Sequence, residues 1–202
     1  MEEGRLALPL AFISAWGVGG VFSIRSRFAS SRESIFAMPL PMPREVEINL
    51  YHNIGAIIIR WGVLDALLAT SCQILFENLK GHPSHKEPPR ALSKRLEFMK
   101  KCFNNKPELA FAAQSVSDLC IAIEEIGKHR DYFVHGCLTD YFPEPTAYQF
   151  TKMDMKPDKT GYDQWSTKLS KTDLLNIAKS SEQVCVRLGE IGRTLRKLSA
   201  SK

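Results

Sequence analysis

Apolar residues recur at steps of three and four along most of the chain after residue 43, a spacing that places them on one face of an α-helix. The clearest run, between residues 44 and 80, forms one long stripe of Ile54, Ile58, Trp61, Leu64, Leu68, Cys72 and Leu75. Four further apolar residues widen it: Ile57, Val63, Leu67 and Ile74. A face this wide predicts burial on two sides, either in the first helix of a bundle or against a second subunit.

The same spacing predicts a second helix over residues 89–104 and a helical stretch over residues 107–135. That stretch is either one helix or two with a break near Ser117. Pro107 suits a first helical turn, where its missing N–H leaves no bond unmade. Gly136 is a typical helix stop, because glycine adopts a left-handed backbone without steric cost.

After Gly136 the pattern changes. Residues 140–145 contain two prolines and predict a loop. Residues 147–155 and 162–169 read as short strands, and the turn-forming residues between them predict one small β-hairpin. Two strands alone are marginally stable in water, so the hairpin must pack on the helices.

A final helix is expected to begin at Ser170 or Thr172, both favourable N-cap residues, and to end near Ser199. The connections between the predicted helices are short. We therefore predict a mainly α fold, an antiparallel bundle of four to five helices with one inserted β-hairpin at about 147–169.

Residues 1–43 differ from the rest. Residues 6–23 are apolar, but a proline and three glycines interrupt them, and their length is at or below the roughly 18-residue limit for a membrane span. Acidic residues precede them, not the basic start of a signal peptide. Three interpretations stay open, in this order: a poorly ordered or spurious extension, a peripheral or membrane anchor, and a cleaved signal. The proline-rich residues 38–43 predict a linker, so the folded domain is expected at 44–199.

The composition adds a mild basic balance, with a formal charge of +5 and a pI of about 9.0. This charge is compatible with an acidic partner such as RNA without identifying one. Five cysteines lack metal-ligand spacing and predict small apolar core residues in a reducing cytoplasm. His82 and His85 are three apart, but without further ligands they are predicted to be loop histidines. Neither a metal nor a cofactor is expected.

The candidate chemistry lies in residues 127–136, which contain Arg130, Asp131 and His135. Chance alone predicts about one such Arg–His spacing in a chain of this composition, so the spacing itself carries little information. Its context carries more, because an acid follows the arginine, a glycine follows the histidine, and aromatic residues surround them. Positions five apart on an ideal helix point about 140° away from each other. The two side chains can therefore share a site only near a helix end or across a dimer interface.

In the alternative interpretation, these three residues have no catalytic role. Arg130 and Asp131 can form an exposed charged pair that contributes little to stability. His135 can then be a helix-end residue with no chemical role.

Residues 130–135, reading Arg-Asp-Tyr-Phe-Val-His, resemble the Arg-polar-x-x-x-His motif of the HEPN superfamily (higher eukaryotes and prokaryotes nucleotide-binding). Residues 61–65 are also similar to first-helix sequences of bacterial HEPN proteins. The resemblance covers roughly residues 44–199 and implies a small helical bundle that dimerises.

Many members of that superfamily are metal-independent endoribonucleases, and others bind a nucleotide or a protein partner without cleavage. The resemblance therefore implies catalytic roles for Arg130, Asp131 and His135, in a composite site at a homodimer interface. It implies RNA or a nucleotide as ligand, a second copy of the chain as partner, and a toxin–antitoxin partner as a further option. A membrane partner is not expected, and the location implied is the cytoplasm.

Overall fold

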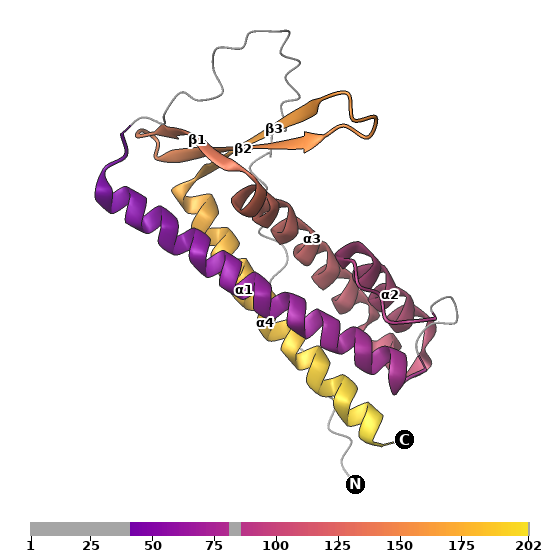
Figure 1. Ribbon diagram of the computed structural model, residues 1–202. Coiled ribbons are helices and arrows are strands. Elements are labelled where there is room, and N and C mark those ends of the chain that lie inside the picture. The colour runs from indigo at the N-terminus through magenta and orange to yellow at the C-terminus, as the bar shows by residue number, and fades with distance from the viewer. Residues whose placement is uncertain (1–40, 81–85, 202) are drawn as a thin grey trace.

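The computed structural model describes residues 41–80 and 86–201 (Figure 1). In chain order its elements are α1 (Arg44–Glu77), α2 (Leu92–Asn105), a 3₁₀ helix (Pro107–Ala112), α3 (Ala113–His135), β1 (Cys137–Phe142), β2 (Ala147–Met155), β3 (Tyr162–Ser170) and α4 (Lys171–Ala200). The mainly helical prediction and the hairpin of β2 and β3 are confirmed. The predictions for residues 1–40 and for His82 and His85 lie outside the described residues.

Local sequence sets the two best-defined helix starts. Pro107 occupies the first turn of the 3₁₀ helix, and α3 follows it directly, so the stretch over 107–135 is two helices with their break at residue 112. Ser170 caps α4: its hydroxyl accepts from the Asp173 N–H at 3.1 Å, and the Asp173 carboxylate accepts from the Ser170 N–H at 2.8 Å. This reciprocal capping box satisfies two backbone donors and places the start of α4 at the end of β3.

The helices do not form the fully antiparallel bundle that was predicted. Arg60 of α1 donates to the Ala178 carbonyl of α4, and Ser71 lies opposite Gly192. Contacts therefore advance together along both helices, so α1 and α4 run side by side in the same direction (Figure 1). The reason is that α3 carries the chain back to the sheet, near the N-terminal end of α1, and α4 starts from that end.

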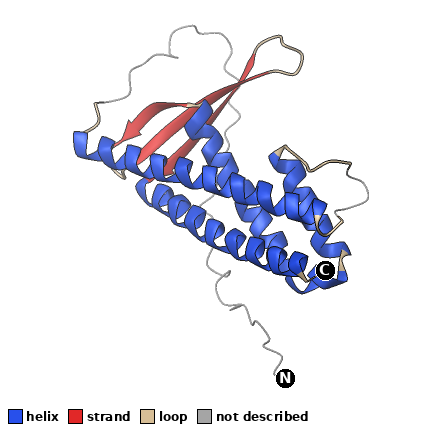
Figure 2. Ribbon diagram, turned by 60° about the horizontal axis from the view of Figure 1, so that its bottom comes forward, coloured by secondary structure: helices blue, strands red, loops and turns tan. Residues whose placement is uncertain are grey.

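Two apolar clusters hold the fold together. The larger fills the space between the four helices, with Leu64, Leu68, Leu96, Phe98, Val116 and Leu188 among its fully buried members. The smaller packs the sheet on the helices through Leu50, Tyr141, Tyr148, Phe150, Leu169 and Leu174. The sheet thus covers one end of the helical layer, where α1 and α4 begin and α3 ends (Figure 2).

Strand β1 was not predicted, since residues 140–145 were assigned to a loop. It pairs with β2 and completes a three-stranded antiparallel sheet in the order β1-β2-β3. A bulge lies between Leu138 and Asp140, so Leu138 and Tyr141 both pack in the smaller cluster although they are three residues apart. The bulge breaks the two-residue alternation by which a strand is recognised in sequence.

Gly136 ends α3 for a different reason from the one predicted. Its φ is −102° and its ψ is −179°, which is extended backbone open to any residue. A Cβ on Gly136 would lie 2.5 Å from the Tyr132 carbonyl oxygen and 2.8 Å from the Thr151 carbonyl oxygen. Glycine is needed here because the backbone of β2 passes directly against the last turn of α3.

One face of α1 has no cover among the described residues. We call it the α1 stripe: Ile48, Tyr51, Ile59 and Val63, with Gly55 and Gly62 between them. By length and composition α1 could cross a membrane, although core helices of soluble proteins pass the same test. The opposite face of α1 carries Leu64, Leu68 and Leu75, which are buried in the helical core.

Candidate active site

The last two turns of α3 bring the three predicted residues together. His135 is the final residue of the helix, and the Arg130 guanidinium extends along the helix toward it. Arg130 Nη1 lies 3.3 Å from His135 Nε2. Of the two arrangements that the sequence left open for side chains five positions apart, the helix end is the one observed within a single chain.

Asp131 lies between this pair and the sheet. Its Oδ1 is 3.8 Å from His135 Nε2, and its Oδ2 accepts a hydrogen bond from Lys152 of β2. The carboxylate therefore touches both the Lys152 ammonium and the His135 imidazole. The side chains of His135 and Asp131 remain open to solvent, at 60% and 39% exposed.

Lys152 is the site residue that the sequence did not reveal. Its ammonium bridges Asp131 and Asp154, with Asp154 Oδ2 at 3.2 Å, and lies 5.5 Å from the centre of the Tyr132 ring. Its side chain is only 16% exposed. Burial disfavours the charged form, but the hydrogen bonds to the two carboxylates outweigh it and raise the pKa of Lys152 above its ordinary value.

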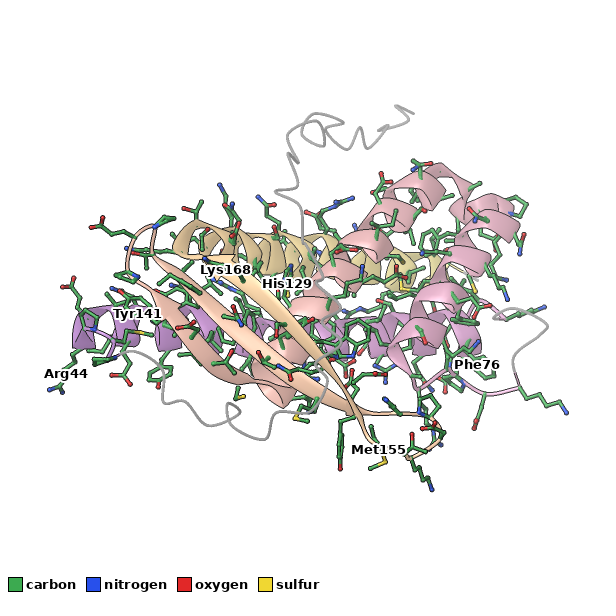
Figure 3. The ribbon with its side chains drawn as sticks, turned by 90° about the horizontal axis from the view of Figure 1, so that it is seen from above. Arg44, Phe76, His129, Tyr141, Met155 and Lys168 are labelled. Atoms are coloured by element: carbon green, nitrogen blue, oxygen red, sulfur yellow. The ribbon has the colours of Figure 1, made fainter. Side chains whose placement is uncertain are left out.

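The alternating pattern of β2 could have indicated that Lys152 faces the helices. Tyr148, Phe150 and Lys152 alternate along β2, so all three point from the same face of the sheet toward the helices. Figure 3 shows Met155 at the far end of the hairpin, away from Tyr141 and Arg44. Lys152 thus lies between the buried part of β2 and its projecting tip.

The four charged groups balance one another. Arg130 and Lys152 supply two positive charges, and Asp131 and Asp154 supply two negative ones. We call Arg130, Asp131, His135 and Lys152 the α3–β2 cluster. Together with Asp154, these side chains carry no net charge when His135 is neutral, so charge alone does not attract an anion. Anion binding would instead depend on hydrogen bonds from the Arg130 guanidinium.

His129, next to Arg130 in sequence, does not join the cluster. Burial lowers its pKa, although Glu125 and Asp173, the latter from the first turn of α4, act in the other direction. Its position six residues before His135 turns it to the α4 side of the helix. It is part of the packing between α3 and α4.

The cysteines are free thiols, and three of them are buried in the helical core. Burial raises the pKa of Cys72 to about 12, of Cys102 to about 11 and of Cys120 to about 12. These thiols are therefore protonated and serve as apolar packing groups, as the sequence predicted. Cys137 departs from that prediction, because it is exposed at the start of β1. Among residues 41–80 and 86–201, no three His, Cys, Asp or Glu side chains are grouped to hold a metal ion.

Comparison of the chain with protein-family models, with curated proteins and with solved structures finds no match.

Proposed function

We propose that this protein is an endoribonuclease of the HEPN type that cleaves RNA without a metal ion. The observation that carries the proposal is the 3.3 Å separation between Arg130 Nη1 and the solvent-exposed His135 Nε2. It joins a phosphate-binding group to a proton-transfer group at one surface point. The resemblance of residues 130–135 to the HEPN motif supports the same chemistry.

The reaction uses the ribose 2′-OH of the RNA as nucleophile and the side chains of this cluster as catalytic groups. A histidine imidazole takes the proton of the ribose 2′-OH, and the 2′-oxygen attacks the adjacent phosphorus. The bond from phosphorus to the 5′-oxygen breaks, and that oxygen receives a proton. Arg130 stabilises the negative charge that develops on the phosphoryl oxygens. The products are a 2′,3′-cyclic phosphate and a 5′-hydroxyl.

One cluster contains one histidine, whereas the reaction requires both a base and an acid. A second copy of the chain would supply a second His135 and a second Arg130. We therefore propose that the working site is composite, with one α3–β2 cluster from each of two chains.

Mixed dimers test this point. Wild-type chains are unfolded and refolded together with His135→Ala chains at varied ratios. Activity should fall with the square of the wild-type fraction, because only dimers with two histidines are active. A linear fall would mean that each chain is self-sufficient.

The α1 stripe supports a second copy of this chain as partner. Its side chains are strongly exposed, with Ile59 at 71% and Tyr51 at 61%. The two charged residues of this stretch, Arg60 and Asp65, pair elsewhere, with Glu182 and Arg95. The stripe is therefore uncharged and extends over about 23 Å from residue 48 to residue 63.

Its small residues also fit self-association. Nothing lies within 4 Å of a Cβ built on Gly55 or Gly62, so a second helix can approach their backbone closely. In an antiparallel two-fold crossing between Ile58 and Ile59, Gly55 would face Gly62 of the second copy. Tyr51 would then lie against the small side chain of Ala66.

Ile59→Lys tests the partner surface. This variant should be monomeric by light scattering while the wild type is dimeric, and it should lose cleavage activity. Val186→Lys, at an exposed apolar residue on α4, is the matched control and should stay dimeric. A wild-type monomer would contradict the dimer.

The main experiment measures cleavage of a broad panel of single-stranded RNAs in EDTA. Wild type and Arg193→Ala, an exposed arginine on α4, should cleave equally. Arg130→Ala and His135→Ala should lose activity by two orders of magnitude or more, the scale of a lost general base or charge stabiliser. Activity that needs a metal, or that survives both substitutions, would refute the proposal. Ligand binding without any cleavage would favour the non-catalytic alternative.

A further inference from the structure

The two carboxylate oxygens of Asp131 have different neighbours. One carboxylate oxygen of Asp131 accepts from Lys152, and the other lies 3.8 Å from His135 Nε2. The same imidazole nitrogen lies 3.3 Å from Arg130 Nη1. His135 Nε2 therefore lies close to one positive group, the Arg130 guanidinium, and one negative group, the Asp131 carboxylate.

The two charged groups favour different protonation states of His135 Nε2. Arg130 can only donate, so its hydrogen bond to Nε2 requires that nitrogen to be unprotonated. The Asp131 carboxylate only accepts when ionised, so it favours a proton on Nε2. Whatever weakens the negative charge at Asp131 shifts His135 toward the unprotonated form, which is the form that can act as a base.

We infer that Lys152 is a positioning residue, which holds the Asp131 carboxylate and limits how strongly that carboxylate retains a proton on His135. The inference rests on the proposed function for its catalytic meaning, but its physical basis is the geometry of the cluster. Lys152 is suited to this role because its ammonium is fixed by two carboxylates and covered by the Tyr132 ring. A surface lysine with free rotation could not fix the carboxylate in this way.

Among the residues that the structure describes, two elements supply the charged groups near His135. Its own helix supplies Arg130 and Asp131, and the neighbouring strand β2 supplies Lys152 and, behind it, Asp154. Removing the positive charge of Lys152 leaves the Asp131 charge uncompensated. One unit charge at roughly 7 Å in water moves a titration by about half a pH unit. This direct effect is the smallest rise expected for the His135 midpoint, and release of the Asp131 carboxylate from Lys152 should add to it.

The test is an NMR titration of the His135 ring in the full chain, with the resonance assigned from its absence in His135→Ala. Lys152→Met should raise the midpoint by more than about half a pH unit, the part due to the lost charge alone. Lys152→Arg, which keeps a positive charge beside Asp131, should restore it. Lys168→Met is the matched control, because Lys168 lies over the Phe142 ring and outside the cluster. It should leave the midpoint unchanged.

A double substitution shows whether Lys152 acts through Asp131. In the Asp131→Asn background only the direct effect of the lost charge remains, so Lys152→Met should shift the midpoint by no more than about half a pH unit. An equal shift in that background would overturn the positioning role, as would an unchanged midpoint in folded Lys152→Met. If Lys152→Met fails to fold, Lys152→Gln replaces it, since it keeps a polar group beside Asp131.

Activity distinguishes this inference from the proposed function. The NMR titration requires no RNA, so a protein that fails to cleave but shows the predicted shifts would refute only the nuclease. In an active enzyme, the pH–rate profile of Lys152→Met should move by the same interval as the NMR midpoint. A lower rate with an unmoved profile would mean that Lys152 contacts RNA directly and would overturn its role as a positioning residue.

Discussion

Gly136→Ala should destabilise the protein, because a Cβ at this position would collide with the backbone of both α3 and β2. The added Cβ would meet two backbone oxygens, those of Tyr132 at 2.5 Å and Thr151 at 2.8 Å. Neither atom can rotate away as a side chain could, so the strand or the helix end must shift. Overpacking of this kind typically costs about 1–3 kcal/mol. For a chain of this size, that cost corresponds to a fall in Tm of roughly 2–12 °C.

Thermal unfolding followed by circular dichroism measures the effect. Gly189→Ala in α4 is the matched control, since nothing lies within 4 Å of its added Cβ. Alanine there should stabilise the helix by up to about 1 kcal/mol, so the two substitutions should move Tm in opposite directions. If Gly136→Ala were as stable as Gly189→Ala, β2 would not pass close to the end of α3. Lys152 would then not contact Asp131.

Three further predictions concern stability and reactivity. His129 has a lowered pKa in the fold, so the unfolded chain gains its proton first as the pH falls through about 6.5. The free energy of unfolding should therefore decrease below that pH, and less steeply in His129→Gln, as measured by urea unfolding across pH; equal slopes would contradict the burial of this imidazole. A thiol reagent applied to the native protein should modify exposed Cys137 quickly and buried Cys72 only on unfolding, which peptide mass spectrometry can measure. Ser170→Ala should remove the capping box of α4 and destabilise the protein by about 1 kcal/mol in thermal unfolding, whereas an unchanged Tm would show that the cap contributes nothing.

Much of the fold could be predicted because it depends on local patterns. The apolar periodicity predicted the four α-helices of the described residues, and the alternation over 147–155 and 162–169 predicted β2 and β3. Ser170 was one of two predicted N-cap candidates, with Thr172, because capping depends only on residues within one helical turn. The meeting of Arg130 and His135 was also predictable, since both lie on one helix and one of them ends it.

The rest depends on contacts between distant segments. The parallel pairing of α1 and α4 joins residues more than 100 positions apart, and no local pattern encodes its direction. Strand β1 is short, and its bulge removes the alternation that would identify it. Lys152 joins the cluster only because β2 crosses the end of α3, and that crossing depends on the missing side chain of Gly136.

The most direct test of the central claim uses one RNA oligonucleotide and its variant with a single 2′-deoxy sugar at the cleaved position. Both are incubated with the wild-type protein in EDTA, and the product ends are read by mass spectrometry. The α3–β2 cluster predicts cleavage of the RNA to a 2′,3′-cyclic phosphate and a 5′-hydroxyl, and no cleavage at the deoxy position. Cleavage of the deoxy variant at that position, or no cleavage of either oligonucleotide, would contradict the claim.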